Sequence, residues 1–266
     1  MDVLFPGWQV GEERVLVFSP HDDDGILGAG YAILAALAGG ADVYVAIFCD
    51  GWAGYSTPEE AATIVERRRG ETVAAYGALG IPEDHIVRFD YPDLSLWSWL
   101  GWQLPGHAQG ANARVLPRMR ELRPTRLLVP NGYREHVDHE ATFRIGLYDG
   151  PQVGGAILAE YGRVEPIRSY LQYSVGSNFS PEDALAAGVC GRIRANRAIV
   201  VRAEVEDHIV RAIWRFESQH QVIARIMETR RRNRVREGRA VELYLALDPR
   251  PLLDYEPYHH LIARID

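Results

Sequence analysis

Lysine is absent from this chain of 266 residues, and all 29 of its basic residues are arginine. The chain therefore has no lysine for Schiff-base chemistry, general base catalysis or a Walker-type phosphate site. Cysteine is scarce as well: Cys49 and Cys190 are too few for a disulfide framework or a cysteine-based zinc site. No run of about 18 or more apolar residues occurs, so no membrane span is expected.

Basic residues are fewer than acidic residues, 29 against 36. The formal net charge is −7 at pH 7, which argues against nucleic acid as the main partner. The arginine-rich stretch 230–236 is interpreted as a solvated face. Residues Met1 to Pro6 lack the basic region of a signal peptide, so a cytoplasmic location is expected. We expect a small-molecule substrate, and a homo-oligomer is left open.

Short apolar segments alternate with helix-like segments over the first 150 residues. The expected strands are 14–19, 42–48, 86–89 and 126–129. The expected helices are 26–38, 57–79, 109–122 and 136–147. This alternation predicts an α/β fold with a Rossmann-like, mostly parallel sheet and helices on both faces.

Beyond residue 150 the pattern loosens. Further strands are expected at 168–175 and 198–203, and one long helix at 205–228. The tail from Val241 is expected to add an edge hairpin or to cover the site. We interpret residues 1–266 as one domain, with an α/β core over 1–150 and a C-terminal α+β elaboration over 151–266.

Two acidic-histidine clusters stand directly after expected strands. Pro20-His21-Asp22-Asp23-Asp24 follows the strand at 14–19, and Glu135-His136-Val137-Asp138-His139 follows the strand at 126–129. Open α/β sheets bind ligands beyond the carboxyl ends of their strands, so the two clusters should converge on one pocket.

The residue types in these clusters suit a catalytic metal. His21 and Asp24 are three residues apart, as are His136 and His139, so each pair can reach one ion. Two histidines, one aspartate and a water make a workable open zinc site, where zinc lowers the pKa of its water. Asp23 is the natural general base. Asp138 would hydrogen-bond a ring nitrogen of His136 and keep it protonated as a general acid.

The order and spacing of these residues resemble the PIG-L/LmbE-type zinc-dependent N-acetylglucosaminyl deacetylase family. The family pattern begins Pro-His-Pro-Asp-Asp-Glu and later has His-Pro-Asp-His; the resemblance covers about residues 14–147. Further positions fit as well: Gly28, Gly30, Asp50-Gly51, Arg68 with Glu71, Leu79-Gly80 and Asp93, with a weaker match at Phe216-Glu217-Ser218-Gln219.

The resemblance implies a role for each site residue. His21, Asp24 and His139 would bind Zn²⁺ or another divalent metal. Asp23 would be the general base, and His136, oriented by Asp138, the acid or oxyanion partner. The two residues expected to contact the sugar are Arg68 and Asp93. The expected reaction is removal of the N-acetyl group from an N-acetylglucosamine-type conjugate.

Two positions depart from the family pattern. Asp22 stands where the family has proline, and Gly25 where it has glutamate. Neither change removes an expected metal ligand or the expected base. We expect them to affect tuning and substrate choice more than the class of reaction.

Other interpretations remain open. Residues 22–27 resemble the Asp-x-Asp-Gly-x-Leu motif of haloacid-dehalogenase-type phosphatases, with Asp22 as nucleophile, although those enzymes usually need a lysine. Gly28-Ala29-Gly30 suggests a nucleotide-binding turn, and a non-catalytic carbohydrate-binding relative is a third possibility. The three aspartates could simply cap a helix. Trp97, Trp99 and Trp102 could stack on a sugar or pack within a loop.

Overall fold

The fold is described from a computed structural model. It describes residues 1–189 and 191–265, apart from the side chains of Glu237 and His260. Cys190, one of the two cysteines considered above, lies outside the described residues.

A seven-stranded sheet forms the centre of the molecule, in the order β3-β2-β1-β4-β5-β7-β6. The strands are β1 (Arg14–Ser19), β2 (Asp42–Cys49), β3 (Ile86–Tyr91), β4 (Arg126–Pro130), β5 (Ser169–Tyr173), β6 (Arg197–Val201) and β7 (Ala240–Leu247). Strands β1 to β5 pair in parallel, whereas β7 is antiparallel to both of its neighbours. The predicted mostly parallel sheet is therefore confirmed.

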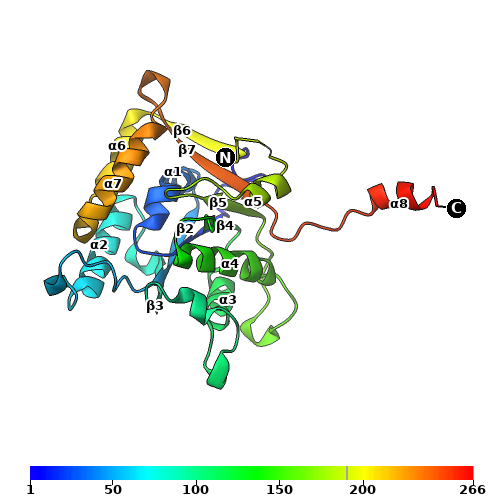
Figure 1. Ribbon diagram of the computed structural model, residues 1–266, viewed down its shortest axis with the longest axis horizontal. Coiled ribbons are helices and arrows are strands. Elements are labelled where there is room, and N and C mark those ends of the chain that lie inside the picture. The colour runs from blue at the N-terminus through cyan, green and yellow to red at the C-terminus, as the bar shows by residue number, and fades with distance from the viewer. Residues whose placement is uncertain (190, 266) are drawn as a thin grey trace.

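Helices cover both faces of this sheet (Figure 1). They are α1 (Asp24–Ala38), α2 (Ile64–Ala78), α3 (Ala111–Leu122), α4 (Val137–Gln152), α5 (Pro181–Ala186), α6 (Ala203–Ile213), α7 (His220–Arg230) and α8 (Glu256–Ile262). Side chains alternate along a strand, so β1 contributes residues to a hydrophobic core on each face of the sheet. Val15 and Val17 pack with α1, α2, α6 and α7, while Leu16 and Phe18 pack with α3 and α4.

The long helix expected at 205–228 is wrong in one respect, because the chain breaks between α6 and α7. A short 3-10 helix, Glu217–Gln219, fills the break. The Glu71 carboxylate on α2 accepts hydrogen bonds from the Ser218 N–H and hydroxyl, at 2.8 and 2.7 Å. These contacts hold the break against α2.

The helix expected at 57–79 begins later than predicted. Thr57 and Glu60 form a capping box around a 3-10 turn, Pro58–Glu60, and α2 starts only at Ile64. The capping signal in the sequence thus marks a short turn ahead of the main helix.

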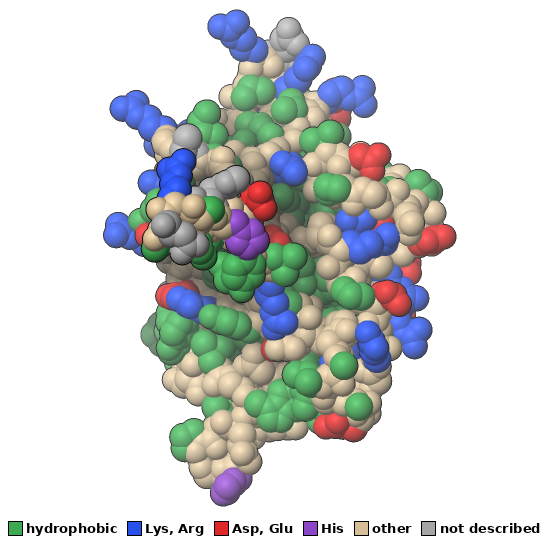
Figure 2. Space-filling view, turned by 90° about the vertical axis from the view of Figure 1, so that its right-hand side faces the viewer, with side chains coloured by type: hydrophobic (Ala, Val, Ile, Leu, Met, Phe, Trp, Pro, Cys, Tyr) green, Lys and Arg blue, Asp and Glu red, His purple; other side chains and the backbone are tan. Residues whose placement is uncertain are grey.

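The C-terminal segment divides into two parts. Strand β7 joins the sheet and pairs with β6 at its edge. Beyond it, α8 stands away from the body at the right of Figure 1, with Leu252 and Ile265 largely exposed. Figure 2 looks onto this side, where hydrophobic and arginine side chains surround a hollow near the centre. No helix within the described residues is long and apolar enough to cross a membrane.

Candidate active site

The two acidic-histidine clusters meet because β1 and β4 are neighbours in the sheet. His21 and Asp24 come from the turn after β1 and the start of α1, and His139 comes from the first turn of α4. Asp24 Oδ2 lies 3.0 Å from His21 Nδ1 and 3.0 Å from His139 Nε2. The three side chains expected to bind metal therefore point at one another.

Each of these two histidines has a carboxylate behind it. The other ring nitrogen of His139, Nδ1, lies 2.9 Å from Glu135 Oε2, and His21 Nε2 lies 3.3 Å from Asp138 Oδ2. Such outer carboxylates fix the ring orientation of metal-binding histidines. Glu135 stands in the second cluster, but no role for it was expected from the sequence. Its position four residues before His139 was the available indication.

Glu135 is itself held by a dense set of donors. Its Oε1 accepts N–H groups from Val175, Gly176 and Ser177 at 2.9–3.1 Å and the Ser174 hydroxyl at 2.6 Å. These residues form the loop that follows β5. The pKa of Glu135 is lowered even though burial would raise it, because His139, Ser174 and the backbone stabilise its charge.

Asp138 does not make the contact expected of it. Its carboxylate lies 3.6 Å from His136 Nδ1, which is an ion-pair distance beyond hydrogen-bonding range, and it accepts N–H groups from Leu94 and Leu96 at 2.6 and 3.1 Å. His136 Nδ1 instead accepts the backbone N–H of Asp138 and caps α4. The predicted hydrogen bond in which the Asp138 carboxylate accepts from the His136 ring is thus wrong.

The structure favours a neutral His136, whereas a protonated His136 was expected from the sequence. Burial and the neighbouring His21 lower the pKa of His136, and Asp138 only partly opposes them. Because Nδ1 accepts a hydrogen bond, a neutral His136 carries its proton on Nε2. This ring is also the most exposed of the three histidines, with 34% of its side chain accessible.

The central aspartates occupy different environments. Asp23 takes the N-cap position of α1 but makes no capping hydrogen bond, so helix capping does not account for it. Burial raises the pKa of Asp23, and the Arg68 guanidinium, 3.4 Å away, opposes the shift. Asp24, by contrast, has a pKa well below its usual range: burial would raise it, but His139 and His21 stabilise the carboxylate.

Asp22 is fully buried, and donors contact both of its carboxylate oxygens. Arg68 Nε donates to Oδ2 at 3.0 Å, while Thr72 Oγ1 at 2.7 Å and Arg88 Nη1 at 2.5 Å donate to Oδ1. Burial would raise the pKa of Asp22, but the two arginines lower it. A carboxylate that is fully buried and held by two arginines is poorly placed to attack a phosphate ester, which argues against the phosphatase interpretation.

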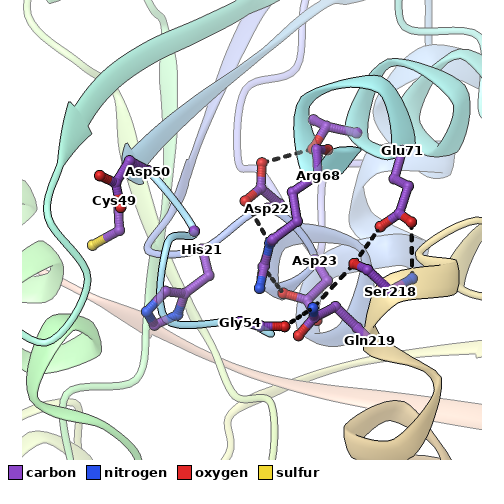
Figure 3. A network of polar contacts seen from close by, with 12 residues as sticks. His21, Asp22, Asp23, Cys49, Asp50, Gly54, Arg68, Glu71, Ser218 and Gln219 are labelled. Carbon is purple, nitrogen blue, oxygen red and sulfur yellow. Dashed lines mark hydrogen bonds and ion pairs between the residues drawn. The ribbon is translucent and has the colours of Figure 1, made fainter. Parts of the chain in front are cut away.

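Arg68 and Asp93, the expected sugar contacts, are both buried, and Asp93 holds the loop after β2. Asp93 accepts the N–H groups of Gly51 and Ala53 at 2.9 and 3.1 Å. Figure 3 shows Arg68 reaching both Asp22 and Asp23, with Gln219 donating to the Gly54 carbonyl close by. Contact of either residue with a sugar stays a prediction.

The donor set fits a divalent cation. Burial would lower the pKa of His21, but Asp138 and Asp24 raise it to about 10; Asp24 and Glu135 likewise overcome burial and raise that of His139 to about 9. The surrounding carboxylates thus favour positive charge at this point. His21 also falls in two other possible ligand groups, one with His136 and Asp138 and one with Cys49 and Asp93. Burial raises the pKa of the Cys49 thiol, which disfavours the thiolate form that binds metals.

A family model described as PIG-L, GlcNAc-PI de-N-acetylase, matches residues 16–148, half of the chain. The chain belongs to the PIG-L family. Membership confirms the predicted resemblance, and the chain is an amide-hydrolysing deacetylase of this family. Among curated proteins, none matches the chain.

Solved structures share the fold of this PIG-L protein at low identity. The conserved protein TT1542 from Thermus thermophilus is 21% identical, with a TM-score of 0.65 over 90% of this chain and 96% of that one. N,N'-diacetylchitobiose deacetylase from Pyrococcus horikoshii is 16% identical, with a TM-score of 0.65 over 89% and 84%. GalB, the 4-carboxy-2-hydroxymuconate hydratase from Pseudomonas putida KT2440, is 18% identical, with a TM-score of 0.64 over 91% and 99%.

The departures from the PIG-L pattern have local causes in the structure. A Cβ added at Gly25 would lie 2.6 Å from the Tyr76 hydroxyl, so this tyrosine occupies the space into which a side chain would extend. Asp22 replaces proline where Arg68 and Arg88 converge.

The glycines of the proposed nucleotide-binding turn are packing residues. A Cβ at Gly28 would lie 2.4 Å from the Tyr173 ring, and one at Gly30 would lie 2.9 Å from Ile209. Both glycines allow α1 to approach its neighbours, and neither lies in an open turn that a nucleotide could enter.

Proposed function

We propose that this chain is a zinc-dependent hydrolase that removes the N-acetyl group from an N-acetylglucosamine-type conjugate. The observation that carries the proposal is the convergence of His21, Asp24 and His139, each histidine backed by its own carboxylate, directly beside Asp23. The PIG-L family match supports the class of reaction, and the donor types favour zinc among divalent metals.

His21 Nδ1, Asp24 Oδ2 and His139 Nε2 would hold the metal. When bound, a divalent zinc ion supplies Lewis acidity, which polarises an acetamide carbonyl and makes water easier to deprotonate. With a metal bound, Asp138 and Glu135 would accept the one remaining N–H of each imidazole ring, which would leave Nδ1 of His21 and Nε2 of His139 free of a proton.

Asp23 acts as the general base. Its raised pKa brings it closer to neutral pH, where a carboxylate exchanges protons most effectively with a reacting group. It takes a proton from the attacking water and then passes it to the leaving amine nitrogen. Arg68, 3.4 Å from Asp23, opposes the rise that burial causes in the pKa of this carboxylate and so favours the ionised form that takes the proton.

His136 stabilises the developing oxyanion. Its Nδ1 is engaged by the α4 backbone, so Nε2–H is the donor that a neutral ring offers to a substrate oxygen. Two roles were expected for His136, general acid or oxyanion partner. This assignment keeps the oxyanion role and gives the general acid role to Asp23. Acetate and a free amino sugar leave.

Acetate release tests the proposal. The purified protein, with its metal content determined, is incubated with N-acetylglucosamine conjugates, and acetate is quantified together with the free amine. We expect equal amounts of both products and loss of activity after chelation, with recovery on adding zinc. A fully metal-loaded protein that releases no acetate from N-acetylglucosamine conjugates, but cleaves a phosphate ester or hydrates a carbon–carbon double bond, would contradict it.

A further inference from the structure

A cavity of about 690 Å³ lies beside the candidate active site, between the loop after β5 and the strands β6 and β7. Its walls come from Ser174 to Phe179, from residues 192–198, from α7 and from the start of α1. None of the proposed catalytic or metal-binding side chains lines it.

Three arginines line this cavity without a carboxylate partner. Among the described residues, Arg192, Arg194 and Arg197 make no ion pair within 4.0 Å. Arg194 donates to the Phe179 carbonyl at 3.0 Å and Arg197 to the Asn196 carbonyl at 2.8 Å, and both acceptors are neutral. The pKa of Glu182 is lowered by the Ser180 hydroxyl and also, from outside ion-pair range, by Arg194, so Arg192 and Arg197 are the two arginines without a nearby carboxylate among the described residues. Arg230, which also lines the cavity, differs because it is paired with Glu206 and Glu242.

Arg197 gives the strongest evidence for an anion site among the three arginines. It pairs in register with Tyr244, whose hydroxyl accepts the Ala32 N–H of α1, so both side chains lie on the α1 face of the sheet. Its Nε is buried and has no hydrogen-bond partner. An anion beside this guanidinium would supply an acceptor that the fold itself does not provide.

The remaining walls of the cavity are apolar. Leu27 of α1 and Ile226 of α7 line it on the same face of the sheet as Arg197. The cavity lining thus has a cationic part and an apolar part. A ligand that suits both parts has an oxyanion to contact the arginines and an apolar group to pack against the leucine and isoleucine side chains.

The cavity is close to the proposed chemistry. Leu27 follows Asp24 by three residues, less than one turn of α1. Ser174 and Ser177, which line the cavity, also bind the Glu135 carboxylate that holds His139. One loop therefore separates the two sites.

We propose that this cavity is a subsite for an anionic group, phosphate or carboxylate, on an amphipathic substrate. The inference rests on the proposed function, and it narrows the substrate to amino-sugar conjugates whose aglycone is both acidic and partly apolar.

Binding of simple probes tests the subsite without any turnover. Isothermal titration calorimetry compares octyl phosphate, octyl glucoside and inorganic phosphate on the wild type and on the double variant Arg192→Gln/Arg197→Gln. The control is Arg211→Gln, an exposed arginine on α6 that does not line the cavity. Metal content is measured in every sample, because phosphate can also bind a metal.

The subsite predicts that wild type binds octyl phosphate at least about tenfold more tightly than either other probe, and that the double variant loses this preference while the control keeps it. Equal binding of octyl phosphate by the double variant and the wild type would overturn the proposal. If inorganic phosphate binds as tightly as octyl phosphate, the proposed contact of the cavity with an apolar group is overturned.

A kinetic comparison separates this inference from the proposed function. In the double variant, KM for an acidic N-acetylglucosamine conjugate should rise about tenfold or more, with KM for a neutral conjugate and both kcat values nearly unchanged. If arginine-dependent binding of octyl phosphate is found but no conjugate releases acetate, the subsite stands and the proposed function fails. If acetate is released but the double variant changes KM equally for acidic and neutral conjugates, the proposed function stands and the subsite fails.

Discussion

At the scale of single residues, the carboxylates behind the site histidines are the most informative feature. Glu135 and Asp138 make no direct contact with Asp24, yet they set which nitrogen of His139 and of His21 faces it. Both carboxylates have a lowered pKa despite burial, because imidazole and N–H groups surround them. They are therefore ionised at neutral pH and favour a cation between the histidines.

Removing the charge of either carboxylate should weaken metal binding. We expect Glu135→Gln and Asp138→Asn each to raise the Kd for zinc by about 10–100-fold, because the ring each one orients becomes less basic and less fixed. Competition with a chelating dye measures the change. Glu140→Gln, a partly exposed position on the same helix, is the matched control and should bind zinc like the wild type. Unaltered affinity in both site variants would remove these residues from the metal centre.

The sequence predicted which residues gather at the site better than it predicted their partners. The spacing of His21 and Asp24, and the position of His139 after β4, were enough to bring these side chains together. The contact of Asp138 with His21 joins residues 117 positions apart. No local pattern reveals such a contact, so the adjacent His136 was chosen instead. The arginine clamp on Asp22 was missed for the same reason.

At the scale of elements, the loop after β2 connects the site to α2 and to the break between α6 and α7. Asp93 holds Gly51 and Ala53, Gln219 donates to the Gly54 carbonyl at 2.6 Å, and Arg68 packs beneath. A Cβ added at Gly54 would lie 2.3 Å from Arg68 Nη1. Glycine is thus needed here for close approach to the side chain that also contacts Asp23.

Gly54→Ala should therefore damage catalysis more than stability. Displacing Arg68 shifts its contacts with Asp22 and Asp23, and we expect kcat/KM for acetate release to fall roughly 10–100-fold. Gly70→Ala is the control, because a Cβ at this α2 position meets nothing within 4 Å. It should keep full activity and raise the free energy of unfolding by about 0.5–1 kcal/mol. Full activity in Gly54→Ala would show that the loop does not position Arg68.

Element prediction succeeded where the hydrophobic pattern was continuous. The strands of the first 150 residues and the helices between them follow from short apolar runs and clear breaks. The helix expected at 205–228 failed because helical periodicity continues through residues 214–219. The hydrogen bonds from Ser218 to Glu71 interrupt it, and they depend on a residue 147 positions away.

At the scale of the whole molecule, a buried charge cluster joins the amino ends of the central strands. Glu13, just before β1, accepts hydrogen bonds from Arg126 Nε and Nη2, both at 3.0 Å, and from the Thr125 hydroxyl. Arg168 adds a further cationic contact at 2.9 Å. This cluster lies at the opposite end of the strands from the catalytic residues, so it affects folding without touching the site.

The cluster predicts an acid-dependent loss of stability. Burial would raise the pKa of Glu13, but Arg126 and Thr125 lower it from 4.5 to about 2. A lowered folded-state pKa contributes stability that is present above pH 4.5 and is lost as the pH falls towards 2. The loss should approach about 3 kcal/mol.

Urea unfolding between pH 7 and pH 3 measures this dependence, and about 2 kcal/mol of the loss falls within that range. Glu13→Gln should be less stable than the wild type at pH 7, because it leaves Arg126 buried without a counter-charge, and its stability should change less on acidification. Parallel pH profiles for the two proteins would show that Glu13 does not contribute to acid sensitivity.

The central claim, that Asp23 is the base of a metal-dependent deacetylase, is tested most directly by measuring metal content and acetate release on the same samples of wild type and Asp23→Asn. Asparagine keeps the size of the side chain but cannot take a proton, and Asp23 is not among the three metal-holding residues. We predict that the variant retains its zinc while acetate release falls about 10²–10⁴-fold. An Asp23→Asn protein with unchanged zinc and near wild-type acetate release would contradict the account.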